Sequence, residues 1–308
     1  MNGLPIPDSI QIVYFSGSGG TQMAAEAFAA ECAQRDIPHL LYAIDRSRIK
    51  GNPVLPFSPS SFTLLLYAVH ALDAPAPVYD WIEGSTFPAG SKFGVFSVSG
   101  GGEIWPNTGC RSLVIQALEQ KGCDVCMDDM LVMPSNMNPT GGDDVAVWLL
   151  RALPIKAKEI MDVVLSGNMR RTKYRLDPFR MFMVKSEKKN AHKFVETIRV
   201  QDFCTGCGWC AKNCPQNNIG MEGGRPVFNA YCVLCLRCVY GCPARALHTK
   251  HSIVIQAGFD LAAIQKRMAG REPKPFTECC RGLIWSGVLK YLKSAFPPEN
   301  EDKQKAAL

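Results

Sequence analysis

Eight cysteines in the second half of the chain have the residue type and spacing to hold inorganic clusters. They lie in two runs, 204–215 and 232–243, and each run reads C-x2-C-x2-C-x3-C-P. Thiolates at this spacing suit two [4Fe–4S] clusters, and the fourth cysteine of each run then ligates the cluster of the other run. We expect cluster one to take Cys204, Cys207, Cys210 and Cys242. We expect cluster two to take Cys232, Cys235, Cys238 and Cys214.

Zinc and disulfides are the alternatives for these cysteines. Zinc ribbons use two C-x2-C pairs and lack both the third cysteine step and the C-P ending. Disulfide frameworks belong to oxidising compartments, and residues 1–8 lack the charged start and long apolar run of a secretory signal. The pattern therefore favours clusters in a cytoplasmic protein. Two facing clusters give a short path for electrons rather than a site for making and breaking bonds.

A second candidate site is a loop rich in glycine and hydroxyl groups near the N-terminus. It follows a β-rich run at 10–14 and precedes a helical pattern that begins near Met23. This geometry binds phosphate through backbone N–H groups and hydroxyls. The expected contacts are Ser16, Gly17, Ser18, Gly19, Gly20 and Thr21. A Gly/Ser turn without a ligand is the alternative.

The type of phosphate ligand can be narrowed by motif. The loop lacks the Gly-Lys-Ser/Thr of a Walker A loop, and Gln22 stands where a dinucleotide-binding loop needs its last glycine. It does match [S/T]-x-[S/T]-G-x-T and so resembles the FMN phosphate loop of flavodoxins. The resemblance implies FMN as a cofactor.

The elements that position this loop form an α/β pattern. Strand-like runs recur at βα spacing, with a helical pattern at 108–122. This order predicts a flavodoxin-like, doubly wound, parallel five-stranded sheet with ligands at the carboxyl ends of its strands. The expected strands are 10–14, 38–44, 62–69, 92–98 and 125–133.

Two loops at such strand ends are candidates for flavin-ring contacts. Glycines let a backbone approach a flat ring closely. Trp105 could stack on the ring, although a tryptophan at a loop end also fits simple packing. His70 could lie near the ring, with a surface histidine as the alternative. The candidate ring contacts are His70, Ser99, Gly100, Gly101, Gly102 and Trp105.

Residues 200–250 resemble a bacterial two-cluster ferredoxin of the small α+β type. Together with the flavodoxin-like first half, this means that residues 8–250 resemble the flavodoxin–ferredoxin fusion proteins of anaerobic bacteria and archaea. Met133-Pro134 and Asn136 match a Met-Pro-x-Asn turn of that family. Residues 68–71 depart from the family's Pro-Val-Tyr-Gly. The resemblance implies a flavodoxin-like domain at 1–168, a basic linker at 169–198, a two-cluster ferredoxin-like domain at 199–252 and a helical tail at 253–308.

Composition and charge narrow the function classes. The chain is 47% hydrophobic and 20% charged, as in ordinary globular proteins, and no apolar run reaches the ~18 residues of a membrane span. Residues 151–200 hold thirteen Lys/Arg against five Asp/Glu. This bias suits a docking face for an acidic redox partner or a solvated linker. No nucleic-acid motif accompanies it.

Three functions remain open. The favoured one is an electron-transfer protein that passes electrons between two [4Fe–4S] clusters and FMN, with redox proteins as donor and acceptor. The second is an FMN-dependent reductase of an organic substrate, which its ferredoxin module supplies with electrons. The third is a redox sensor or docking subunit without catalysis. Whether the chain is an enzyme, and whether it forms a homodimer, stays open from the sequence.

Overall fold

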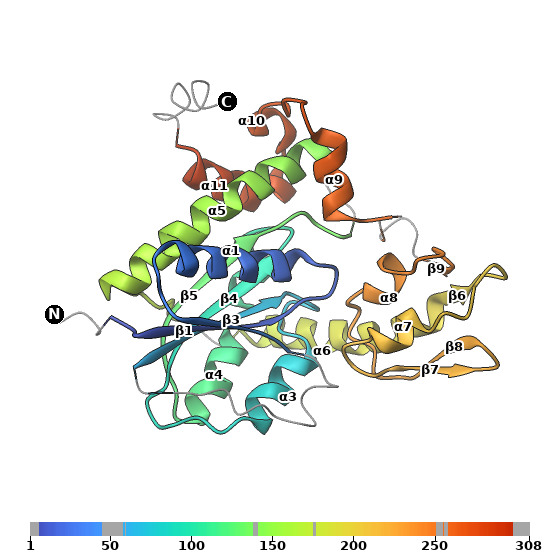
Figure 1. The fold of residues 1–308 in the computed structure, drawn as a ribbon, viewed down its shortest axis with the longest axis horizontal. Coiled ribbons are helices and arrows are strands. Elements are labelled where there is room, and N and C mark those ends of the chain that lie inside the picture. The colour runs from blue at the N-terminus through green and yellow to red at the C-terminus, as the bar shows by residue number, and fades with distance from the viewer. Residues whose placement is uncertain are drawn as a thin grey trace.

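The computed structural model describes residues 6–44, 58, 60–137, 141–174, 177–250, 255 and 258–297. The first half folds around a parallel five-stranded sheet with the strand order β2-β1-β3-β4-β5 (Figure 1). This order confirms the flavodoxin-like doubly wound sheet. The strands are β1 (Ser9–Phe15), β2 (His39–Ala43), β3 (Ser61–Ala68), β4 (Lys92–Ser99) and β5 (Asp124–Val132).

Both faces of this sheet are covered by helices. The central strand β3 is buried along nearly its whole length, as a parallel strand between two helical layers requires. In Figure 1, α1 and α5 lie above the sheet, and α3 and α4 lie below it. The covering helices are α1 (Gly20–Gln34), α3 (Ala76–Gly84), α4 (Ser112–Gln120) and α5 (Gly142–Ser166).

The cysteine runs lie in a small module at one end of the molecule, on the right of Figure 1. Two antiparallel strand pairs, β6–β9 and β7–β8, frame it, and each cysteine run contains a one-turn helix. This confirms the small α+β module. Its elements are β6 (Ile198–Val200), α7 (Trp209–Lys212), β7 (Ile219–Glu222), β8 (Arg225–Phe228), α8 (Arg237–Tyr240) and β9 (Leu247–Thr249).

The stretch expected as a basic linker contains a helix, α6 (Pro178–Lys193). Asp177 caps its N-terminus by accepting hydrogen bonds from the backbone N–H groups of Phe179 at 3.0 Å and Arg180 at 3.1 Å. Lys188 pairs with the buried carboxylate of Asp73 at 2.5 Å. This part of the stretch is therefore attached to the sheet domain.

The C-terminal tail packs back on the sheet domain. Its helices are α9 (Leu261–Met268), α10 (Phe276–Cys279) and α11 (Ser286–Ala295). Val288 and Leu292 of α11 are fully buried in a cluster with Leu149 of α5 and Phe276 of α10. The tail thus extends the core of the first half.

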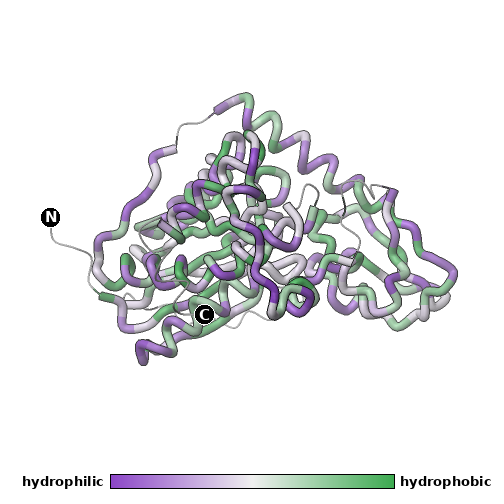
Figure 2. The backbone as a smooth tube through the Cα atoms, turned by 90° about the horizontal axis from the view of Figure 1, so that it is seen from above, coloured by the Kyte–Doolittle hydropathy of each residue, from purple (hydrophilic) through white to green (hydrophobic). Residues whose placement is uncertain are grey.

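The view from above shows the same large and small lobes, with hydrophobic and hydrophilic residues alternating along the surface helices (Figure 2). Among the residues that the structure describes, no helix combines the length and the apolar character needed to cross a membrane.

Truncation of the tail's buried anchor should destabilise the fold. Leu292 is 0% exposed, so Leu292→Ala leaves a cavity and should cost about 3 kcal/mol of unfolding free energy. Leu283→Ala is the control, because Leu283 is 91% exposed and should change stability by less than about 0.5 kcal/mol. Chemical denaturation measures both. Equal midpoints for the two variants would contradict the docking of α11.

Candidate functional site

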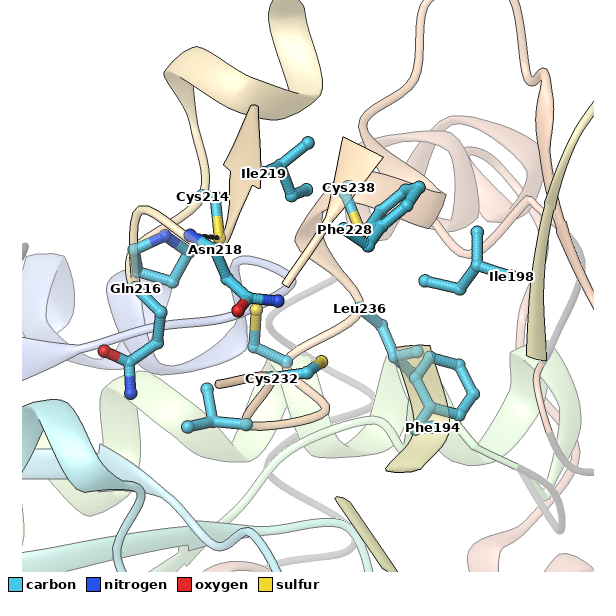
Figure 3. Close-up of a pocket in the computed structure, with 13 residues that line it drawn as sticks. Phe194, Ile198, Cys214, Gln216, Asn218, Ile219, Phe228, Cys232, Leu236 and Cys238 are labelled. Carbon is cyan, nitrogen blue, oxygen red and sulfur yellow. Dashed lines mark hydrogen bonds between the residues drawn. The ribbon is translucent and has the colours of Figure 1, made fainter. Parts of the chain in front are cut away.

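The eight motif cysteines divide between two cavities of the small module. Figure 3 shows one of them, here called the first cavity. Cysteine sulfurs point into it, and the apolar side chains of Phe194, Ile198 and Leu236 form other parts of its wall. The first cavity, of about 420 Å³, is lined by Cys214, Cys232, Cys235 and Cys238. The second, of about 330 Å³, is lined by Cys204, Cys207, Cys210 and Cys242. This division coincides with the two ligand sets expected from the sequence, and cluster ligation itself stays a prediction.

The backbone around the two cavities repeats itself at an interval of 28 residues. Gly206 and Gly208 have φ angles of 67° and 70°, and the matching Leu234 and Leu236 have φ angles of 54° and 60°. A left-handed leucine costs about 1–2 kcal/mol. Such strain persists where function requires a particular chain path. Here that path wraps the backbone around a space bordered by sulfur, which fits a bound cluster.

Backbone amides donate to the sulfurs at matching positions. The N–H of Asn218 donates to Cys214 Sγ, and the N–H of Ala246 donates to Cys242 Sγ, each at 3.3 Å. Within the described parts of the chain, no three His, Cys, Asp or Glu side chains are placed to hold a single metal ion. At a cluster ligand, N–H donors of this kind tune the reduction potential of an iron–sulfur cluster.

The expected phosphate loop joins β1 to α1. Gly19 has a φ angle of 99° and stands directly before the first residue of the helix, a conformation that favours glycine. The hydroxyls of Ser16 and Thr21 are buried and, among the described residues, have no hydrogen-bond partner. Buried polar groups normally have one. Two orphaned hydroxyls beside a helix N-terminus fit an absent phosphate.

A cleft of about 500 Å³ opens from this loop along the carboxyl ends of β1, β3, β4 and β5. Its position is the one at which doubly wound sheets bind ligands. Asn136, in the turn after β5, donates from Nδ2 to Ser18 Oγ at 2.8 Å and so links the two ends of the cleft. The residues predicted from the sequence that line it are Ser16, Gly17, Ser18, Gly20, Thr21, His70, Ser99 and Gly100.

Four other predicted contacts do not line this cleft. Gly19 borders a neighbouring cleft instead. Gly102 lies against Gly287 of α11, and a Cβ on Gly102 would approach the Gly287 carbonyl carbon to 2.6 Å. Trp105 stacks on Phe179 of α6, with ring centroids 6.1 Å apart, and remains 55% exposed. Gly101 is likewise outside the lining. Gly102 therefore serves packing against the tail, whereas Gly100 lines the cleft and lies against Ser135.

The second cysteine run packs directly on the phosphate loop. A Cβ on Gly17 would lie 2.5 Å from the carbonyl oxygen of Cys235, so only glycine fits there. Val233 and Cys235 belong to the hydrophobic cluster beneath the sheet. The Tyr240 hydroxyl donates to the carbonyl of Asn136. The two candidate cofactor sites are therefore in direct contact.

His70 and Arg237 complete this contact from opposite sides. His70 Nδ1 lies 2.8 Å from the carbonyl of Val233, so Nδ1 carries the hydrogen. Burial lowers the pKa of His70 to about 4. Arg237 donates from Nε to the Gly17 carbonyl at 3.2 Å, and from Nη2 to the Ser16 carbonyl. His70 is half-buried and hydrogen-bonded to the small module rather than freely exposed.

A second cleft, of about 890 Å³, lies between α1, the small module and α9. It borders the outer side of the phosphate loop at Gly17 and Gly19, and it is lined by the aromatic side chains of Trp209, Tyr240 and Phe259. Its place beside both candidate sites gives a small molecule room near either one.

Four cysteines outside the motifs are inert thiols. Burial raises the pKa of Cys32, Cys110, Cys123 and Cys280 to about 11. A thiol with so high a pKa is almost fully protonated at neutral pH and is a poor nucleophile. Their environment fits the role of small hydrophobic side chains.

Comparison with protein families finds one match. Residues 198–220 match the family described as the 4Fe-4S binding domain, which includes the first cysteine run. The chain joins a flavodoxin-like domain to a 4Fe–4S binding domain. This arrangement fits a flavodoxin–ferredoxin fusion.

Solved structures similar to the first half include flavodoxins. An archaeal flavodoxin is 15% identical and covers 51% of this chain and 98% of its own, with a TM-score of 0.36. Flavodoxin 2 from Bacillus cereus is 16% identical and covers 49% and 99%, with a TM-score of 0.35. A Streptococcus pneumoniae flavodoxin is 13% identical and covers 50% and 97%, with a TM-score of 0.35. No curated protein matches the chain. The strand order, rather than these scores, defines the fold.

Sequence reasoning missed the residues that join the two sites. Val233, Arg237 and Tyr240 lie between cysteines or after them, where the motif places no demand on residue type. One signal was present: Arg237 occupies the position that Trp209 has in the first run.

A methyl group at Gly17 should separate the two sites. Gly17→Ala places carbon 2.5 Å from the Cys235 carbonyl oxygen, and such overpacking should cost about 1–3 kcal/mol. Gly20→Ala is the matched control in the same loop, because its nearest contact would be 3.6 Å. Thermal unfolding and limited proteolysis of the module measure the effect. Equal behaviour of the two variants would rule out the tight contact.

His70 should make the free energy of unfolding depend on pH. Unfolded His70 binds a proton below about 6.5, whereas the folded residue does so only below about 4. The unfolded state therefore holds more protons between these values, and stability falls as pH falls from 6.5 to 4. His70→Gln keeps a donor for the Val233 carbonyl and should flatten this part of the profile. An unchanged slope in denaturation curves would refute the burial of His70.

Proposed function

We propose that this protein transfers electrons between two [4Fe–4S] clusters and FMN. The observation that carries the proposal is the direct contact between the phosphate loop and the second cysteine run, at Gly17 and Cys235. The 4Fe–4S clusters would exchange single electrons, and FMN would accept one or two. Direct contact between the sites keeps the path short.

The residues of the first half would hold the flavin by its phosphate and by its ring. Ser16 and Thr21 offer the two free hydroxyls, and the N-terminus of α1 offers backbone N–H groups. The cleft at the ends of β3, β4 and β5 offers room for the ring. His70, neutral at physiological pH, closes the cleft toward the module without adding charge.

The cysteines of the module would hold the clusters in an outer and an inner position. Cys207 of the first set is exposed, whereas Cys235 of the second set is buried against the phosphate loop. An external carrier would therefore dock near Cys207, and the second set would face the flavin. We infer that electrons arrive from a protein donor of low potential at the outer set.

A reductase of an organic substrate is the second candidate function. The cleft of about 890 Å³ beside the phosphate loop favours it, because the aromatic side chains of Trp209, Tyr240 and Phe259 suit an apolar molecule. Anaerobic turnover with added organic acceptors would support it. Flavin oxidation only by electron-carrier proteins would favour the first function.

Cofactor content tests the proposal directly. Protein purified without oxygen should contain about eight iron atoms, about eight sulfides and one FMN per chain, as two [4Fe–4S] clusters and one flavin require. Ser16→Ala and Thr21→Val remove the orphaned hydroxyls and should weaken FMN binding without loss of iron. About eight irons per chain without bound flavin, even after incubation with FMN, would mean that the chain is a ferredoxin joined to a domain that binds no FMN. That result would overturn the proposal.

A further inference from the structure

The two cysteine runs differ in charge at two matching positions, because Arg237 replaces Trp209 and Tyr240 replaces Lys212. The residue directly before the third cysteine is Trp209 in the first run and Arg237 in the second. The Trp209 ring packs against Gly241 of the second run, because a Cβ on Gly241 would meet the ring at 1.9 Å. The first set therefore has an apolar ring where the second has a cation.

Arg237 is held in place by three backbone carbonyls from two segments. Its Nη1 donates to the carbonyl of Asn213 at 3.1 Å, directly before Cys214 of the second set. Its Nε and Nη2 donate to the carbonyls of Gly17 and Ser16 in the phosphate loop. The guanidinium is half-buried, so solvent screens its charge less than that of an exposed side chain.

None of these three hydrogen bonds gives Arg237 a counter-ion. Each of its three printed partners is a neutral carbonyl, and no salt bridge to Arg237 occurs among the described residues. A cation in this position attracts negative charge on either side of it. One side holds four cysteines of the second set, and the other holds the phosphate loop.

We propose that Arg237 is a positioning residue that makes the second cluster site easier to reduce than the first and that strengthens FMN binding at the phosphate loop. The inference rests on the proposed function. A nearby positive charge stabilises the more negative, reduced form of a cluster and raises its reduction potential. One-electron transfer from the outer site to the inner site is then downhill, with a low-potential electron-carrier protein as the reductant.

The effect on FMN has a separate physical cause. The Ser16 carbonyl belongs to the same peptide unit as the Gly17 N–H, and the Gly17 carbonyl belongs to that of the Ser18 N–H. A carbonyl that accepts a hydrogen bond from a guanidinium polarises its peptide unit, which makes the attached N–H a stronger donor. Arg237 thus favours a phosphate at this loop through charge and through polarised amides.

Lys212 is the natural comparison in the first run. Lys212 lies two residues after Cys210, and its side chain is exposed. Solvent and salt screen an exposed charge strongly. We therefore expect the half-buried Arg237, and not Lys212, to set the difference between the two sites.

The test is a reductive titration of the anaerobically purified full chain, followed by electron paramagnetic resonance. Wild type should show two clusters that are reduced at separate potentials, and Cys207→Ser, which alters only the first set, assigns the two signals. Arg237→Gln should shift the second site to lower potential and leave the first unmoved. Lys212→Gln is the control and should move neither.

Binding of added FMN is the second readout. Arg237→Gln should raise the FMN dissociation constant about tenfold, since it removes the charge and the three-way hydrogen bonding. Arg237→Lys keeps the charge but offers a compact ammonium in place of the fork, so it should preserve the potential of the second site while weakening FMN. A variant that keeps the cluster potential but loses FMN affinity distinguishes the effect of charge from the effect of hydrogen-bond geometry. Misfolding would not produce this combination.

Two outcomes would overturn the inference. The first is an unchanged titration curve of Arg237→Gln, and the second is an equal shift of both clusters. Failure of the proposed function looks different, because wild type would then contain iron but bind no FMN. The unequal potentials need only the iron sites, so the role of Arg237 at the second site remains measurable in that case.

Discussion

The contact between the phosphate loop and the second cysteine run is the constraint on which the rest of the structure depends. Gly17 has no side chain because the Cys235 carbonyl occupies the space where one would be. Close approach of two backbones is a use that only glycine permits. Cys235 in turn packs into the hydrophobic cluster of the sheet domain. Any shift of the small module relative to the sheet would therefore disturb both candidate cofactor sites at once.

Buried charges hold the loops that surround this contact. Arg111 pairs with Asp128 at 2.8 Å and with Glu103 at 2.6 Å, and so ties the loop after β4 to β5. Asp73, in the loop after β3, accepts from Tyr79 and pairs with Lys188 of α6. A buried charge is tolerated when it is paired and hydrogen-bonded. These pairs fix the strand ends at which the cleft opens.

Helix α6 connects the sheet domain to the cysteine module and packs against the sheet domain. Arg180 is 5% exposed and donates from Nη2 to the carbonyl of Leu72 at 3.1 Å, beside His70. At its far end, Phe194 enters the hydrophobic cluster of the module together with Leu236. Helix α6 and the residue after it therefore contact both the sheet domain and the cysteine module, which limits the relative motion of the two.

The sheet and the two cysteine sets followed from local rules. The period of apolar residues marks parallel strands, and the C-x2-C-x2-C-x3-C-P spacing determines which sulfurs can share a cavity. The contacts between the halves could not be predicted in this way, because Gly17 and Cys235 are remote in sequence and meet only through tertiary packing. Trp105 illustrates the same limit: its loop was placed at the correct strand end, but Phe179, from a stretch expected to be a linker, provides its stacking partner.

The most direct test of the central claim is the kinetics of flavin reduction inside one molecule. Anaerobic protein with iron and FMN bound is mixed with less than one equivalent of a one-electron reductant, and the flavin absorbance is followed at several protein concentrations. The account predicts a rate of flavin reduction by the clusters that does not depend on protein concentration, because the two sites are in contact. A rate that rises in proportion to protein concentration, or a flavin that stays oxidised while the clusters are reduced, would contradict it.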